Sequence, residues 1–354
     1  MNGYAPRKVR FKCAVVLYML LLVATAGSSS EERAMNWQEE EIRFETGRFD
    51  LHGVLVKPQS RGPHPAVIFI HGDGPINRTM LGYYIPIWKK FVEVGYACMS
   101  WDKPGVGKST GGFGDKTLFH DRASIAAEAV RYLKAREDID GKRIGYWGIS
   151  QAGYIIPLAS SMTKDISFVV AISCPGINSI DQGAYFIRKQ LISEGVNNAV
   201  ARETAGYFLK SRYAQSYEEY IKYAELLGRQ PYLTKSGWAD VKPKDSYAPL
   251  QPDSESLFNP VSVLEEMKFP VLAIFGKKDT QIPPRISAEA YRTALQKAGN
   301  AHSKVIMFPG ADHVIFNTTT GSLKEWEDKF RNQQMDYSPK YLDTMAEWLK
   351  GLLQ

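Results

Sequence analysis

Short, continuous apolar runs alternate with amphipathic stretches from residue 66 onward. A strand covered by helices on both faces of a parallel sheet reads as such a run. Between two of the runs, residues 118–136 place Ile125, Ala129 and Leu133 four positions apart, which is the spacing of one helical face. The alternation predicts an α/β fold with a mostly parallel central sheet and helices on both faces. The predicted strands are Ala66–Ile70, Ala97–Met99, Ile144–Trp147, Phe168–Ile172, Val271–Phe275 and Val305–Phe308.

The pattern differs at the two ends of this region. Residues 42–55 alternate apolar and polar positions around Thr46-Gly47, which predicts a hairpin at an edge of the sheet. A terminal helix is expected to close the fold, with one apolar face formed by Leu342, Met345 and Leu349.

Residues 1–26 have the three parts of a secretory signal peptide. Basic residues precede an apolar run from Cys13 to Ala26, which ends in the small residues Ala24-Thr25-Ala26. The run is about 14 residues long, shorter than the roughly 20 that a spanning helix needs, which favours a cleaved signal over an uncleaved membrane anchor. We therefore expect a secreted or periplasmic protein without stable membrane insertion after signal removal. Residues 27–40 are expected to be a linker and residues 41–354 the folded domain.

The mature chain is close to neutral. Residues 1–26 contain four basic and no acidic side chains, so their removal lowers the net charge from +6 to +2. No stripe of basic residues interleaved with aromatics remains, so no nucleic-acid partner is expected. No Cys-X-X-Cys pair or His-rich cluster predicts a metal site. Gly107-Lys108-Ser109 lacks the glycine that a phosphate-binding loop needs where this chain has Asp102, and no cofactor is expected.

A candidate nucleophile follows the run at Ile144–Trp147. In a nucleophile elbow, a serine is held on a sharp strand-to-helix turn, and the residues two before and two after it must be small. Gly148 and Ala152 flank Ser150 in this way, although glycine is usual at the second position. Ser150 is therefore the candidate nucleophile, and a serine N-cap on an ordinary helix is the alternative.

A serine nucleophile needs a base that takes its proton and an acid that orients the base. Asp279 follows the run Val271–Phe275, and His313 follows Val305–Phe308. Ligands of open α/β sheets bind beyond the carboxyl ends of the strands, so these side chains are expected to meet at one edge in the order Ser, Asp, His. Asp312 is a poorer candidate for the acid because adjacent side chains point apart.

Main-chain N–H groups are expected to form an oxyanion hole. The run Ala66–Ile70 leads into His71-Gly72-Asp73-Gly74-Pro75, where glycines free the backbone to turn an N–H toward the site. The candidate donors are the N–H groups of Asp73 and Gln151. A carboxylate turned into the hole would oppose an oxyanion, so the Asp73 side chain is expected to point away.

These segments resemble the α/β-hydrolase superfamily, and within it the esterase-like branch grouped with serine aminopeptidase-type and dienelactone-hydrolase-type proteins. The likeness extends from about Glu41 to Gln354. Its most specific pieces are His71–Pro75, Asp102–Gly111 and Arg143–Ser150.

The resemblance implies an α/β-hydrolase fold and carries the family's roles to matching positions. Ser150 takes the role of nucleophile, Asp279 of acid and His313 of base, with Gln151 and Asp73 as backbone oxyanion donors. Relatives commonly have serine at position 73 and arginine at position 104, where this chain has Asp73 and Pro104.

The resemblance also implies a helical cap inserted at about residues 175–260, a stretch too long for a simple crossover. Its many aromatic residues would suit an apolar acyl or aryl group, and the alternative is that they hold the cap helices together. The polar stretch at 318–337 is expected to form a second flap through Trp326 and Phe330.

The expected function is hydrolysis of small-molecule carboxylic esters through an acyl-enzyme. An exported serine peptidase or aminopeptidase, a non-catalytic binding protein on the same fold, and acyl transfer to an alcohol are the alternatives. The sequence singles out no substrate-binding residues and no oligomeric state.

Overall fold

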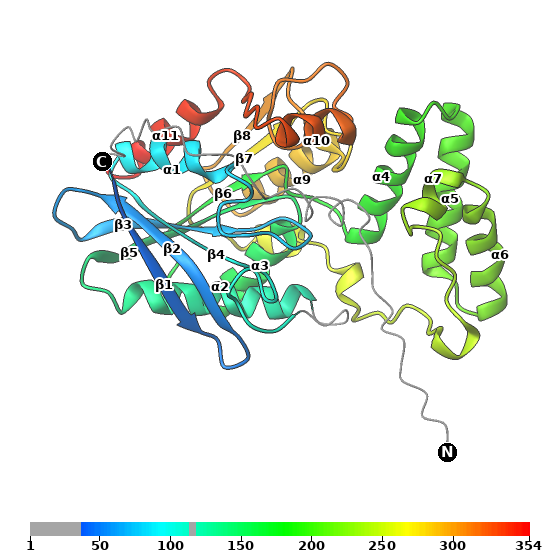
Figure 1. Ribbon diagram of the computed structural model, residues 1–354, viewed down its shortest axis with the longest axis horizontal. Helices are drawn as coiled ribbons and strands as arrows, with labels where there is room; N and C mark the ends of the chain where they lie inside the picture. The colour runs from blue at the N-terminus through cyan, green and yellow to red at the C-terminus, as the bar shows by residue number, and fades with distance from the viewer. Residues whose placement is uncertain (1–36, 113–117) are drawn as a thin grey trace.

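The computed structural model describes residues 37–112 and 118–354 (Figure 1). The expected signal peptide and most of the expected linker lie outside these residues. In the described part of the chain, no helix has the length and apolar character needed to span a membrane.

The first strand, β1, begins at Trp37, so the last four residues of the expected linker belong to the sheet. The prediction was wrong here because Glu40 faces the same side as Ile42 and Phe44 but is charged. Arg136 pairs with that carboxylate, so a charge contact replaces the apolar one that the pattern required.

Eight strands form one sheet in the order β1-β2-β4-β3-β5-β6-β7-β8. The pairs β1–β2 and β2–β4 are antiparallel and the other pairs are parallel. The predicted runs are confirmed as strands, with ends that differ by a few residues, and the hairpin lies at the sheet edge. The strands are β1 Trp37–Glu45, β2 Asp50–Pro58, β3 His64–Ile70, β4 Ala97–Trp101, β5 Ile139–Ile149, β6 Phe168–Ile172, β7 Val271–Gly276 and β8 Lys304–Phe308.

Helices cover both faces of this sheet (Figure 1). In β3, Ile68 belongs to the apolar core that α2, α3 and α9 form with one face of the sheet, and Phe69 belongs to the core that α1 and α11 form with the other. A strand with two buried faces must be apolar at every position, which explains the continuous runs. The helices that cover the two faces are α1 Tyr84–Glu93, α2 Leu118–Lys134, α3 Ala152–Met162, α8 Val261–Leu264, α9 Pro284–Lys297, α10 Leu323–Arg331 and α11 Tyr341–Gly351.

Apart from α8, which packs with the sheet, the helices between β6 and β7 form a separate group beside the sheet (Figure 1). They have a small apolar core of their own. Trp238 packs against Phe186 and Phe208, with ring centroids 5.4 and 5.7 Å apart, so these aromatics hold the group together. The group comprises α4 Ser179–Ser193, α5 Asn198–Tyr213, α6 Tyr217–Gly228, α7 Pro231–Lys235 and the 3₁₀ turns η1 Lys244–Ser246 and η2 Glu255–Leu257.

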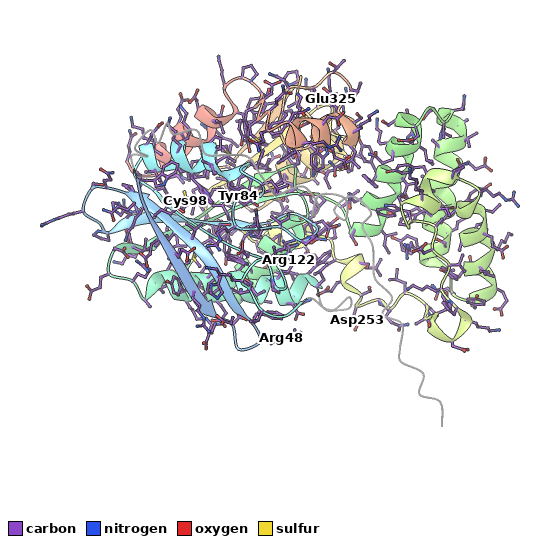
Figure 2. The ribbon with its side chains drawn as sticks, in the orientation of Figure 1. Arg48, Tyr84, Cys98, Arg122, Asp253 and Glu325 are labelled. Atoms are coloured by element: carbon purple, nitrogen blue, oxygen red, sulfur yellow. The ribbon has the colours of Figure 1, made fainter. Side chains whose placement is uncertain are left out.

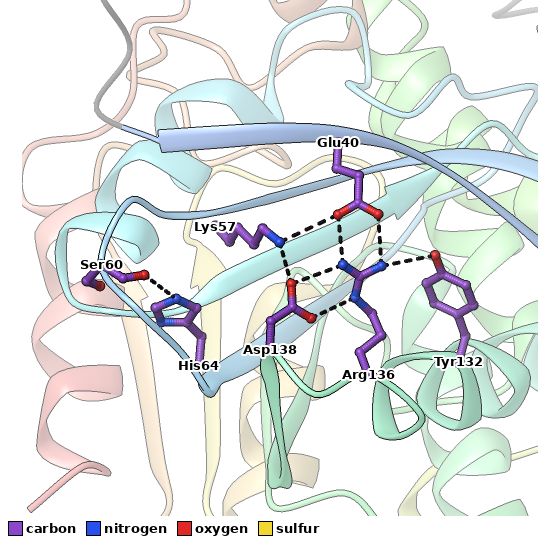
Figure 3. A network of polar contacts seen from close by, with 7 residues as sticks. All are labelled: Glu40, Lys57, Ser60, His64, Tyr132, Arg136 and Asp138. Carbon is purple, nitrogen blue, oxygen red and sulfur yellow. Dashed lines mark hydrogen bonds and ion pairs between the residues drawn. The ribbon is translucent and has the colours of Figure 1, made fainter.

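An ion-pair network joins β1 and β2 to the start of β5 (Figure 3). Arg136 bonds to both Glu40 and Asp138, and Lys57 contacts the same two carboxylates. Hydrogen bonds from Arg136 lower the pKa of both carboxyl groups. The network lies at the amino end of β5, whereas Ser150 follows the carboxyl end of the same strand.

Replacing Arg136 with methionine is expected to destabilise the protein by about 1 kcal/mol at pH 7, the scale of a partly exposed ion pair. A carboxyl group with a lowered folded-state pKa stabilises the fold above its unfolded pKa of about 4, and this contribution is lost as the pH falls through the folded value. The gap in melting temperature between the parent and Arg136→Met should therefore stay constant between pH 7 and about pH 5 and narrow as the pH falls below about 4. Arg292→Met, which removes an exposed pair with Glu289, is the control. A gap for Arg136→Met that does not narrow below about pH 4 would contradict this account.

Candidate active site

The residues singled out in the sequence follow parallel strands at one edge of the sheet. The segment 71–75 follows β3, Ser150 follows β5, Asp279 follows β7 and His313 follows β8. A Cβ placed on Gly72 would lie 3.4 Å from Cβ of Ser150, so the segment after β3 lies directly against the turn after β5.

Ser150 lies on the turn between β5 and α3. Its φ is +59°, in the left-handed region that residues other than glycine adopt rarely. Its N–H donates to the carbonyl of Ile172 at the end of β6, with an N···O distance of 3.0 Å. A strained turn of this kind is the feature that presents the serine hydroxyl in a nucleophile elbow.

Gly148 makes room for this turn. A Cβ at position 148 would lie 2.7 Å from Cβ of Ala152 and 2.6 Å from Cδ1 of Ile156, far inside the distance at which carbon atoms pack. The alanine at 152, where relatives usually have glycine, fits because residue 148 has no side chain.

Asp279 and His313 form a buried pair. Nδ1 of His313 lies 2.8 Å from Oδ2 of Asp279. The other carboxylate oxygen, Oδ1, accepts hydrogen bonds from the N–H groups of Gln281 and Ile282 at 2.7 and 2.9 Å. Because Asp279 occupies Nδ1, proton transfer at this imidazole falls to Nε2.

Asp312, next to the base, binds the backbone instead of the imidazole. Its Oδ1 accepts hydrogen bonds from the N–H groups of Val314 and Phe316 at 3.0 and 2.9 Å. Burial raises the pKa of Asp312 to about 7. The side chain therefore shapes the loop that holds His313.

Arg122, from α2, is a buried cation that the sequence analysis missed. It donates to the carbonyl oxygen of His71 and to Oε1 of Gln151, and its position is labelled in Figure 2. Burial lowers the pKa of Arg122 to about 10, so the guanidinium is charged at neutral pH. A guanidinium can only donate hydrogen bonds, so the oxygen of the Gln151 carboxamide must face Arg122. The NH₂ group of the carboxamide is then turned toward Asp73. Nε2 of Gln151 donates to Oδ1 of Asp73 at 3.0 Å.

His71 has a structural role at the start of this segment. Its ring nitrogens bond to the hydroxyl of Tyr84 at 2.9 Å and the carbonyl of Trp101 at 2.7 Å. Burial lowers its pKa well below the usual range, which favours a neutral ring.

A cavity of about 190 Å³ opens beside the candidate oxyanion donors. It is lined by Asp73, Gly74, Pro75, Lys103, Pro104, Leu118 and Gln151. Within residues 37–112 and 118–354, no cluster of three or more His, Cys, Asp or Glu side chains could hold a metal ion.

The first helix of the group beside the sheet contacts the loop that carries the acid. The hydroxyl of Tyr185 donates to the carbonyl of Asp279 at 2.7 Å, and Nε2 of Gln182 donates to the carbonyl of Gln281 at 2.8 Å. Helix α4 therefore rests on the residues that orient His313.

Residues 126–318, more than half of the chain, match the family described as BAAT / acyl-CoA thioester hydrolase C terminal. The chain belongs to this family. The match to the BAAT / acyl-CoA thioester hydrolase family includes Ser150, Asp279 and His313. The α/β-hydrolase resemblance expected from the sequence is confirmed.

Other similar proteins include a 31.7 kDa protein of the traX-finO intergenic region of Escherichia coli, 22% identical over 66% of this chain and 79% of its own length. Esterase EstD of Thermotoga maritima is 23% identical, over 84% of this chain and 65% of EstD. The solved structure of the Pyrococcus furiosus esterase Pf2001 superposes with a TM-score of 0.54 at 17% identity, covering 93% of this chain and 98% of that one. This structural likeness shows the fold alone. The family match identifies the chain as a hydrolase of the α/β-hydrolase superfamily.

Proposed function

We propose that the protein is a serine hydrolase that cleaves carboxylic esters of small molecules through an acyl-enzyme. The observation that carries this proposal is the buried His313–Asp279 pair, 2.8 Å between Nδ1 and Oδ2, at the same sheet edge as the strained turn of Ser150. No metal ion or cofactor takes part in the proposed steps.

In the first step, the hydroxyl oxygen of Ser150 bonds to the ester carbonyl carbon and its proton passes to Nε2 of His313. The N–H groups of Asp73 and Gln151 bind the oxyanion that forms. Collapse expels the alkoxide, which takes the proton from His313, and leaves an acyl-serine. Water, deprotonated by His313, then attacks this ester. Collapse breaks the bond between Ser150 Oγ and the acyl carbon, Oγ takes the proton back from His313, and the carboxylic acid is released.

The names of two similar proteins favour an ester substrate over an amide. EstD and Pf2001 are both named esterases. Thioesters are the second candidate, because the family description names acyl-CoA thioester hydrolases.

The signal-like residues 1–26 lead us to propose that the mature enzyme works outside the cytoplasm, secreted or periplasmic.

The test is a comparison of p-nitrophenyl esters of increasing acyl length with acyl-CoA thioesters and with aminoacyl and peptidyl nitroanilides. The mature protein is expected to turn over the esters, with a rate that depends on acyl length, and Ser150→Ala to do so at the background rate. Turnover confined to thioesters would select the second candidate. Turnover confined to anilides would instead establish a peptidase, and identical background rates for both proteins would leave a binding function.

A further inference from the structure

Lys103 is a buried cation directed at the segment that carries an oxyanion donor. It follows β4 and its exposed fraction is only 4%. Its Nζ donates to the carbonyl of Gly72 at 2.6 Å and to the carbonyl of Gly74 at 2.7 Å. Burying an ammonium group is costly unless strong hydrogen bonds replace its hydration, so these contacts constrain the segment firmly.

The carbonyl of Gly72 and the N–H of Asp73 belong to one peptide group. This bond is trans, because the only cis bond in the described part of the chain is Gly62–Pro63. The oxygen and the hydrogen of a planar trans peptide point in opposite directions. An ammonium bonded to the oxygen therefore fixes the direction of the Asp73 N–H on the far side. A charged partner on the oxygen also polarises the peptide and makes its N–H a stronger donor.

We propose that Lys103 is a positioning residue of the oxyanion hole, acting through the Gly72–Asp73 peptide. The inference rests on the proposed hydrolase function, in which the Asp73 N–H binds the oxyanion. Arg122 constrains the preceding peptide group in the same way, because its guanidinium donates to the carbonyl of His71. Two successive peptide groups are thus held at their oxygens by cations.

The test compares two inhibitors that carry the acyl chain of the best ester. A trifluoromethyl ketone accepts the hydroxyl oxygen of Ser150 at its carbonyl carbon, the proton passes to His313, and the carbonyl oxygen becomes a hemiketal oxyanion. The matching methyl ketone resembles the ground state. The inhibition-constant ratio, methyl over trifluoromethyl, reports oxyanion binding. Removal of a direct oxyanion donor costs about 100- to 1000-fold, so Lys103→Met, which acts through the peptide, is expected to lower this ratio by about 10- to 100-fold.

The control is Lys268→Met. Nζ of Lys268 also donates to a backbone carbonyl, that of Ala298, at 2.6 Å. Lys268 precedes β7 and so lies at the opposite edge of the sheet. This variant is expected to keep the parental ratio even where its melting temperature falls.

A second variant guards against a folding defect. Lys103→Gln keeps an N–H donor but removes the charge, and its ratio should also fall. Weaker binding of both ketones by the same factor, or a parental ratio in the folded Lys103 variants, would overturn the inference and leave Lys103 with a purely structural role. Ser150→Ala tests the hydrolase proposal separately, with the dissociation constants of the two ketones measured by direct binding because this variant has no turnover to inhibit. A trifluoromethyl preference that survives this substitution would refute the hydrolase proposal itself.

Discussion

Replacement of Ser150 by alanine is expected to lower kcat/KM for ester hydrolysis by about 10⁶-fold, the scale seen when a serine nucleophile is removed from a working triad. The substitution deletes the only atom that forms the acyl bond in the proposed mechanism. Steady-state kinetics on the best p-nitrophenyl ester measure the loss, and a melting curve checks that the fold persists.

Ser173→Ala is the matched control for this experiment. Ser173 also follows a strand at the same sheet edge, β6, and its φ of +45° lies in the same region as that of Ser150. Its buried hydroxyl has no hydrogen-bond partner among the described residues, so its removal should change kcat/KM by less than about 10-fold. A loss in Ser173→Ala as large as that in Ser150→Ala would contradict the assignment of the nucleophile.

Asp279→Asn is expected to lower kcat by about 10⁴-fold, because the substitution imposes the wrong tautomer on the imidazole. Oδ1 of Asp279 accepts two backbone hydrogen bonds, so the carboxamide oxygen of asparagine must take that place. Its NH₂ group then faces Nδ1 of His313. That nitrogen must accept, so the proton moves to Nε2, which no longer takes a proton from Ser150. The pH dependence of kcat, measured for parent and variant, reports the lost base.

Asp312→Asn is the companion variant. The carboxamide oxygen of asparagine can keep both hydrogen bonds from Val314 and Phe316, and Asp312 makes no bond to the imidazole. We expect kcat to stay within about 10-fold of the parent, since neutral bonds replace bonds to a carboxyl group. A larger loss of kcat in Asp312→Asn than in Asp279→Asn would assign the role of the acid to Asp312 instead of Asp279.

Much of the fold is predictable because burial constrains residue type. Every position of β3 between Ala66 and Ile70 faces a helical layer, so no polar residue fits, and the run is visible in the sequence. The Ser150, Asp279 and His313 positions are predictable for a related reason. Each lies in the loop or turn after a strand, and parallel strands end at one edge.

Lys103 and Arg122 could not be predicted in this way. Their partners are mainly backbone carbonyls and one carboxamide, which leave no pattern in the sequence. Arg122 lies between Asp121 and Ala123 on an amphipathic helix, where a charged residue reads as exposed. The one available signal was helical spacing, since Arg122 lies three or four positions from the apolar residues Phe119, Ile125 and Ala126, which are all buried.

The prediction that Phe330 belongs to a second flap at 318–337 was wrong. Helix α10 packs Phe330 against Phe316 and Tyr83, with ring centroids 5.5 and 6.0 Å apart, on the α1 and α11 face of the sheet. A polar stretch with two aromatics does not distinguish a flap from a helix that buries one side, because both leave their polar residues exposed to solvent.

The central claim is that Ser150 becomes covalently acylated, and fluorophosphonate labelling followed by peptide mass spectrometry tests it most directly. The account predicts one adduct per chain, located on the peptide that contains Ser150, abolished in Ser150→Ala and retained in Ser173→Ala. Labelling at another residue, or no labelling of a folded protein that hydrolyses esters, would contradict the account.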